Sequence, residues 1–156
     1  MVAILADMPD AFRPFPLRDS LGFMLIRTAL RLRLLGNTAL QQEGLDITVD
    51  QWGLLNLLWE QDGQTPVELS RRADKDKPNV TRLLTILEAK ELIFRRPDSQ
   101  DRRSYRIHLT EAGAALKDSL LDIGEACQRQ ACQGLTSQEI ATLKQLLCRV
   151  FANVTA

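Results

Sequence analysis

Five arginines fall within twelve residues and form a dense cluster of positive charge. Asp98 and Asp101 are interleaved with them, and a carboxylate can hold a guanidinium in one orientation through charge-assisted hydrogen bonds. Arginine side chains suit a narrow DNA minor groove, where the negative potential is enhanced. The pattern indicates a contact with nucleic acid, and the alternative is a charged hairpin that only aids solubility. The five residues are Arg95, Arg96, Arg102, Arg103 and Arg106.

The centre of this cluster is a polar stretch at residues 97–104, which is expected to be a loop. A loop tip offers little to pack against, so folding does not explain the adjacent pair Arg102 and Arg103. We expect Arg102 to face DNA, while Arg103 is held by Asp98 or Asp101.

A second set of polar residues occupies one face of the helix predicted at 77–90. Apolar residues at i, i+3, i+4 and i+7 from Val80 form its buried face, so Arg82 and Thr85 point outward. Small polar and cationic side chains can bond base edges in a major groove, although any one of them could be plain helix surface. The residues expected to contact DNA are Ser70, Lys77, Pro78, Asn79, Thr81, Arg82, Thr85, Arg96, Arg102 and Arg103.

The charge distribution supports the same region. The whole chain carries 20 Lys and Arg against 20 Asp and Glu, so its formal net charge is zero. Residues 65–109 hold eleven basic and seven acidic residues, a net charge of +4, whereas residues 1–64 and 110–156 are at −3 and −1. Phosphate binding depends on local positive charge, so the neutral total does not exclude a nucleic-acid partner.

Helix-start signals show which elements position these residues. Thr48, Thr65 and Thr136 are each followed three residues later by Gln or Glu, as in a capping box. Thr110 and Asp76 are plainer N-caps. The predicted helices run over 19–44, 49–60, 66–73 and 77–90, then from Thr110 to a break at Gly134, and finally from Thr136 onward.

In residues 92–109 the spacing of apolar residues is no longer that of a helix. Residues 92–96 and 105–109 read as strands, the second with apolar and polar residues in alternation, and together they predict a hairpin. The expected fold is mainly α with a small β-hairpin wing: a winged helix-turn-helix lobe at 47–109 and a helical dimerisation lobe formed by 19–46 and 110–156. Residues 1–18 are expected to be an N-terminal arm.

Apolar stripes in the first and last helices exceed what one small lobe can cover. That surplus predicts a partner subunit.

The motif segments of this chain are Ile47–Trp52 with Leu54 and Leu55, Leu69–Ala73, Val80–Leu84, Leu87–Ile93, Asp98–Arg103 and Leu109–Gly113. Together they resemble the MarR (multiple antibiotic resistance regulator) family. The similarity covers roughly Ser20 to the C-terminus, and its wing signature is its most specific part. Gln100 stands where the family often has a first wing arginine, and Glu91 stands where a glycine often ends the recognition helix.

The resemblance implies a homodimer in which the first, fifth and sixth helices of two subunits interlock. Two winged lobes would then contact successive half-sites of a near-palindromic operator in double-stranded DNA. Such proteins are usually repressors, and many are released by a small, often aromatic effector or by cysteine oxidation.

A ligand site is expected near Phe23, Arg27 and Trp52. Phe23 and Arg27 lie on the first helix and Trp52 on the second, so they could form an aromatic wall with a nearby cation, suited to an aromatic carboxylate. The alternative is that Phe23 and Trp52 are plain core residues.

A thiol-based redox sensor is the alternative function, using Cys127, Cys132 or Cys148. Family members that sense peroxides generally carry a reactive cysteine near the first helix, but residues 1–126 contain none. Cys127 and Cys132 would lie roughly 140° apart around one helix, which places them poorly to pair with each other.

Other classes of function find less support. The sequence offers no nucleophile–base pair with a supporting motif and no Gly-rich phosphate loop, and it has no metal-ligand spacing; His108 reads as a surface residue. We therefore expect no enzyme activity, cofactor or metal. An interaction module that has lost DNA binding is a further alternative, and the intact basic wing argues against it.

No apolar run approaches the ~20 residues of a membrane-spanning helix, and the first residues do not read as a secretory signal. The expected location is cytoplasmic, with no membrane partner.

Overall fold

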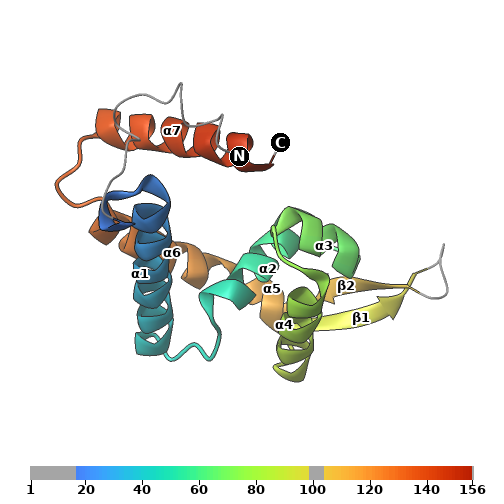
Figure 1. The fold of residues 1–156 in the computed structure, drawn as a ribbon. Helices are drawn as coiled ribbons and strands as arrows, with labels where there is room; N and C mark the ends of the chain where they lie inside the picture. Colours follow the sequence, from blue (N-terminus) through green and yellow to red (C-terminus); the bar gives the residue numbers. More distant parts are fainter. Residues whose placement is uncertain (1–16, 99–103, 156) are drawn as a thin grey trace, which may run out of the picture. The chain divides into compact units, whose positions relative to one another are not determined.

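The computed structural model describes residues 17–98 and 104–155, and the chain divides into two compact units, Met1–Leu35 and Gly36–Ala156. The first unit holds the short 3₁₀ helix η3 and most of α1; the second holds the remaining elements (Figure 1). The elements are η3 (Leu17–Asp19), α1 (Leu21–Gln42), α2 (Val49–Glu60), α3 (Pro66–Arg72), α4 (Lys77–Ala89), β1 (Ile93–Pro97), β2 (Tyr105–Leu109), α5 (Glu111–Ala115), α6 (Lys117–Ala131) and α7 (Ser137–Thr155).

The predicted fold class is confirmed, with one correction. The helix expected to run unbroken from Thr110 to Gly134 is two helices, α5 and α6, interrupted at Leu116. The hydrophobic stripe through Leu116, Leu120 and Ile123 does continue, which is why periodicity alone predicted one helix.

Gly113 accounts for the close packing of the short helix α5. A Cβ placed on Gly113 would lie 2.0 Å from the backbone oxygen of Leu92, which is closer than any real contact. The same carbonyl of Leu92 accepts a hydrogen bond from the Thr110 N–H (3.1 Å), and the Gly113 carbonyl accepts one from the Trp59 indole (3.1 Å). The first turn after the hairpin is therefore set by contacts with α2 and with the start of β1.

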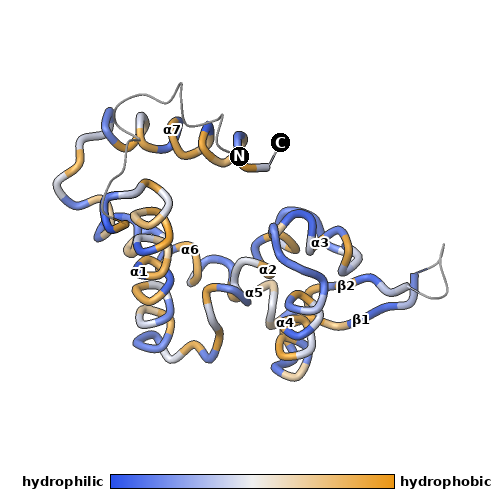
Figure 2. The backbone as a smooth tube through the Cα atoms, viewed as in Figure 1, coloured by the Kyte–Doolittle hydropathy of each residue, from blue (hydrophilic) through white to orange (hydrophobic). Residues whose placement is uncertain are grey.

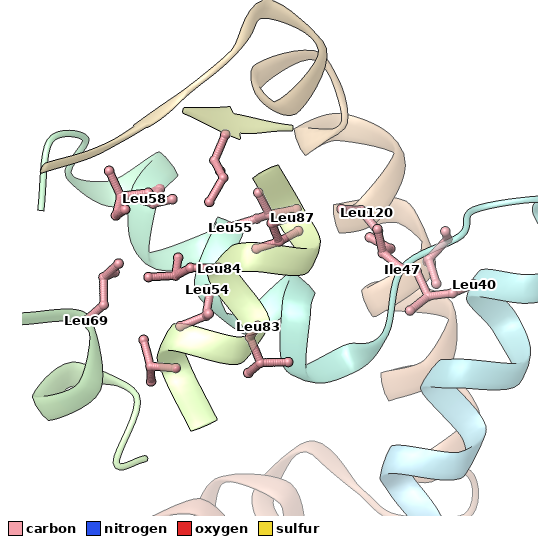
Figure 3. Close-up of a cluster of buried hydrophobic side chains, with 14 residues drawn as sticks. Leu40, Ile47, Leu54, Leu55, Leu58, Leu69, Leu83, Leu84, Leu87 and Leu120 are labelled. Carbon is pink, nitrogen blue, oxygen red and sulfur yellow. The ribbon is translucent and has the colours of Figure 1, made fainter. Parts of the chain in front are cut away.

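The core of the second unit is built where α4 packs on α2. Leu84 and Leu87 of α4 lie among Leu54 and Leu55 of α2, and all four are fully buried (Figure 3). Ile93 and Ile107 extend this cluster onto the hairpin, and Leu40, Ile47, Leu120 and Ile123 extend it toward α1 and α6. The core therefore fixes one face of α4 and leaves the opposite face free.

The predicted capping boxes are present. Thr48 and Gln51 begin α2, and Thr65 and Glu68 begin α3, with each threonine hydroxyl accepting the N3 amide. In α7, the Glu139 carboxylate accepts the Thr136 N–H at 2.7 Å, and the Thr136 hydroxyl accepts the Glu139 N–H at 3.2 Å.

Glu68 makes the start of α3 sensitive to acid. Hydrogen bonds from the Thr65 backbone N–H and hydroxyl hold the pKa of the Glu68 carboxyl below its usual value. Because the folded-state pKa is the lower one, ionised Glu68 stabilises the fold above the unfolded-state pKa, about 4.3. That contribution is lost as the pH falls through the folded-state pKa.

Replacing Glu68 by Gln removes this titration while preserving a capping box, since Gln51 already serves α2 in the same way. We expect Glu68→Gln to change stability little at pH 7, because Glu68 is exposed. In urea titrations, the variant's free energy of unfolding should fall less between pH 6 and about 3 than the parent's. Equal falls would show that this carboxyl does not contribute to acid sensitivity.

The hairpin β1–β2 is antiparallel, with Phe94 opposite His108 and Arg96 opposite Arg106. An isolated bridge pairs Gln64 with Ile107, which attaches the turn after α2 to the edge of β2. The Gln64 side chain is buried and satisfied: its amide donates to the carbonyls of Leu57 and Gln61, and its oxygen accepts from Arg72. The wing is thereby anchored to the body of the second unit.

Hydrophobic residues recur along α1 and α7 (Figure 2), and several of their side chains are exposed. In the first unit, Ile26 and Leu30 of α1 are 63% and 60% exposed. In the second, α7 has no buried residue, and its Leu147 and Phe151 are 39% and 52% exposed. Apolar helix faces of this kind mark a surface for association.

Within residues 17–98 and 104–155, none of the helices is both long enough and apolar enough to cross a membrane.

Candidate nucleic-acid interface

Helices α3 and α4 form a helix-turn-helix with a tight connection. Asp74 has a positive φ of 49° in the turn, and the Lys75 N–H reaches back to the Ser70 carbonyl at 3.1 Å. The Asp76 carboxylate then caps α4 by accepting the Asn79 N–H at 2.8 Å. The Lys75 ammonium lies 2.8 Å from a carboxylate oxygen of Asp50, which ties the turn to α2.

Helix α4 separates apolar from polar residues as predicted. Val80, Leu83, Leu84 and Leu87 are all buried, whereas Arg82 is exposed. The Arg82 guanidinium donates to the Asn79 side-chain oxygen at 3.2 Å, so Arg82 is held along the helix surface with donors to spare.

The hydroxyl groups among the predicted contacts have a more restricted chemistry than their residue types suggest. Each donates its proton to a backbone carbonyl of the preceding turn: Ser70 to Val67 at 2.9 Å, Thr81 to Lys77 at 2.8 Å and Thr85 to Thr81 at 3.0 Å. In this arrangement they offer only lone pairs, whereas phosphate oxygens are acceptors themselves. Phosphate contacts would therefore fall to cations such as Lys77, Arg82 and Arg96.

At the wing, Arg96 is exposed and Asp98 is buried, with 6% of its surface accessible. The Arg106 Nε lies 2.9 Å from an Asp98 carboxylate oxygen, and its Nη1 donates to the Gly63 carbonyl at 2.8 Å. Asp98 thus braces a strand arginine. Arg102, Arg103 and Asp101 lie outside the described residues, so their predicted roles stay predictions.

Two side chains that the sequence reasoning left out of the site hold the wing in place. Arg95 of β1 reaches α4, where its Nη2 donates to the Thr85 hydroxyl at 3.0 Å. Beside β2, Asp62 accepts the Leu109 N–H at 2.9 Å and lies 2.7 Å from the His108 Nδ1. Arg95 was visible in the arginine cluster, but nothing in the sequence indicated which of those arginines would turn toward α4.

Comparison with known proteins identifies the family. The MarR family profile matches residues 47–105, which span α2 through the start of β2. The multiple antibiotic resistance protein MarR of Escherichia coli is 34% identical over 107 residues, covering 68% of this chain and 74% of that protein.

The chain belongs to the MarR family.

Two further comparisons extend the similarity along most of the chain. The organic hydroperoxide resistance transcriptional regulator of Bacillus subtilis is 32% identical over 139 residues, covering 89% of this MarR-family chain and 90% of that protein. A mutant of Escherichia coli MarR, solved in complex with operator DNA, superimposes with a TM-score of 0.80 at 29% identity, covering 87% and 99% of the two chains. The predicted family and the predicted winged-helix fold are both confirmed.

The residues proposed for ligand binding in this MarR-family chain lie in different units. Trp52 belongs to the second unit, where its ring packs so closely on α6 that a Cβ on Gly124 would approach it to 2.8 Å. Phe23, which is partly buried, and Arg27, which is exposed, belong to the first unit. The aromatic wall therefore stays a prediction.

The second unit also contains a cavity of about 510 Å³ between the end of α1 and α6. Its lining includes the carboxylates of Glu43 and Asp122 together with the half-buried Cys127. This lining contains no Lys or Arg. The cavity is therefore poorly suited to the aromatic carboxylate expected beside Arg27.

Proposed function

We propose that this chain is a DNA-binding transcriptional repressor that works as a homodimer. The observation that carries the proposal is the two-sided α4, which buries its apolar face completely and presents Arg82 on the other, directly before a basic hairpin. In this proposal α4 enters the major groove and the wing tip enters the minor groove. The structural similarity to a MarR mutant complexed with operator DNA supports it.

The DNA contacts proposed for this function are those expected from the sequence. On α3 and α4, Lys77 and Arg82 contact phosphates or guanine edges, while Thr81 and Thr85 accept from the amino groups of adenine or cytosine. The further contacts proposed on these two helices are Ser70, Pro78 and Asn79. Those proposed on the wing are Arg96, Arg102 and Arg103.

A direct test uses the chromosomal region beside the gene as a labelled duplex. We expect footprinting to show protection over an inverted repeat, with a much weaker affinity for a scrambled duplex of the same composition. Affinity should fall steeply with salt, because cations displace counterions from phosphates. A reporter driven by the same region should be more active in a deletion strain. Equal affinity for both duplexes would contradict sequence-specific regulation, and a less active reporter would indicate an activator.

We also expect the protein to be a dimer in solution. The exposed leucines of α1 and α7 need a partner surface, so light scattering should give twice the chain mass of 17.6 kDa. Leu147→Asp should shift the protein toward monomer, whereas the neighbouring exposed residue Gln145, changed to Glu, should leave the dimer intact. A monomeric parent that still bound the duplex tightly would refute the dimer.

We also propose that a small aromatic carboxylate releases the repressor by binding near Phe23, Arg27 and Trp52. Salicylate should quench part of the tryptophan fluorescence and weaken DNA binding together. Trp52→Phe should remove the quenching, while Trp59, which bonds the Gly113 carbonyl, remains as an internal reference. Quenching without loss of DNA affinity would show binding that does not regulate.

A thiol-based switch is the alternative to ligand release. The similarity to an organic hydroperoxide resistance regulator favours testing it, although residues 1–126 contain no cysteine. Cys148 is exposed on α7, and Cys127 and Cys132 are half-buried. If oxidation regulates the protein, hydroperoxide should abolish DNA binding in the parent and not in a variant with all three cysteines changed to serine.

A further inference from the structure

The guanidinium of Arg95 contacts two other elements of the winged lobe, α4 and β2. Its Nη2 donates to the Thr85 hydroxyl of α4 at 3.0 Å, and its Nε lies 3.2 Å from a Glu88 carboxylate oxygen of the same helix. Its Cζ stands 5.0 Å from the centre of the Tyr105 ring on β2. Arg95 itself belongs to β1, so one side chain joins the recognition helix to both strands of the wing.

Arg95 and Glu88 form an ion pair, but the N–H group at Nε of Arg95 does not point at the Glu88 oxygen well enough to form a hydrogen bond. The Arg95 Nε is buried and has no hydrogen-bond partner, although the Glu88 oxygen lies within pairing distance. The attraction between these two side chains is therefore mainly electrostatic. Glu88 balances the charge of Arg95 at a side chain that is only 30% exposed.

The buried core also joins α4 to the wing, since Ile93 and Ile107 of the hairpin lie in the same cluster as Leu84 and Leu87. The chain passes from α4 to β1 through Lys90, Glu91 and Leu92, and Glu91 takes a positive φ of 57° there. Thr85 and Glu88 are three residues apart on α4 and therefore share one side of the helix. An arginine suits this position because its planar fork can bond the helix while its face stacks on the tyrosine ring, which a lysine cannot do.

We propose that Arg95 is a positioning residue that sets the spacing between the recognition helix and the wing. This inference rests on the proposed function, because the spacing matters when α4 and the wing bind DNA together. Arg95 acts through Thr85, Glu88 and Tyr105 and does not itself contact DNA. Loss of the Arg95 contacts should weaken DNA binding, because α4 and the wing would then move independently and would have to be ordered when they bind.

The sharpest test removes a negative charge. Glu88→Ala deletes an acid near the C-terminal end of a DNA-binding helix. Loss of its repulsion toward phosphates alone predicts tighter DNA binding, and the helix dipole predicts a helix at least as stable. If Arg95 positions the wing through Glu88, the variant should instead bind DNA more weakly, with a loss of affinity of roughly three- to thirtyfold. Glu91→Gln is the matched control, since Glu91 is exposed and close by in the chain, while the Arg95 contacts with α4 are to Thr85 and Glu88; this variant should bind equally well or more tightly.

The probe for these measurements is the duplex covering the chromosomal region beside the gene, with the scrambled duplex as reference. Arg95→Met should weaken binding to the first duplex by a similar factor and leave the salt slope unchanged, because no phosphate contact is lost. Arg95→Lys should recover only part of the affinity. A shallower salt slope for Arg95→Met would identify Arg95 as a direct phosphate contact and overturn the proposal.

A measurement without DNA separates this inference from the proposed function. In the free protein, Arg95→Met and Glu88→Ala should speed amide hydrogen exchange in β1 and β2, while exchange in α6 stays at the parent rate. Unchanged exchange in the hairpin, or tighter DNA binding by Glu88→Ala, would overturn the role of Arg95. A parent protein that preferred neither duplex would refute the proposed function alone, since the exchange result needs no DNA.

Discussion

Replacing Gly113 with alanine should destabilise the protein by about 3 kcal/mol or more. The added methyl group would lie 2.0 Å from the Leu92 backbone oxygen, so either α5 or the start of β1 must move. Movement of either segment would also disturb the hydrogen bonds from Thr110 to Leu92 and from Trp59 to Gly113. For a chain of this length the thermal midpoint should fall by roughly 6–12 °C.

Gly53 provides the control for this substitution. It lies within α2, and a Cβ there would meet nothing within 4 Å. Gly53→Ala should raise stability by about 0.5–1 kcal/mol, because alanine loses less backbone entropy in a helix. Calorimetry of both variants would test the packing argument. A Gly113→Ala protein as stable as the parent would show that α5 can be displaced at little cost.

Changing Arg82 to alanine should weaken operator binding by roughly 1–3 kcal/mol per subunit while leaving the fold intact. The side chain is exposed and opposite the buried face of α4, so its removal creates no cavity. If Arg82 reads a guanine, specificity should relax at a single base pair in each half-site. If it binds a phosphate, all duplexes should weaken alike and the salt slope should become shallower.

Arg129→Ala is the matched control for charge. Arg129 lies on α6 with 71% of its side chain exposed, and it pairs only loosely with Glu125 at 3.4 Å. Its loss should not change operator affinity in a titration that resolves twofold differences. If Arg82→Ala also binds like the parent, the outward face of α4 does not contact DNA.

Local signals were enough to predict most of the elements. Thr48, Thr65 and Thr136 each carry their capping partner three residues along the chain, so the information lies within one helical turn. The buried face of α4 could likewise be read from the spacing of Val80 and Leu84, because a helix repeats every 3.6 residues.

Features that depend on contacts between distant segments could not be predicted. The break at Leu116 accompanies the approach of Gly113 to Leu92, which are 21 residues apart in the sequence. The pairing of Asp98 with Arg106 on the neighbouring strand was not expected from the sequence, whereas the expected bond between Asp98 and a loop arginine stays a prediction. Which side chains pair across two strands depends on the register of the hairpin, and the types of residue present do not determine that register.

The exposed apolar face of α7 has a genetic consequence. In the proposed dimer, pairing depends on α7 and DNA contact depends on α4, so the two properties reside in separate helices. An Arg82→Ala chain made alongside the normal one should therefore enter mixed pairs and leave each with a single working lobe. That allele should be dominant over the normal gene. Adding Leu147→Asp in the same chain should make it recessive, because the defective product could no longer capture its normal counterpart.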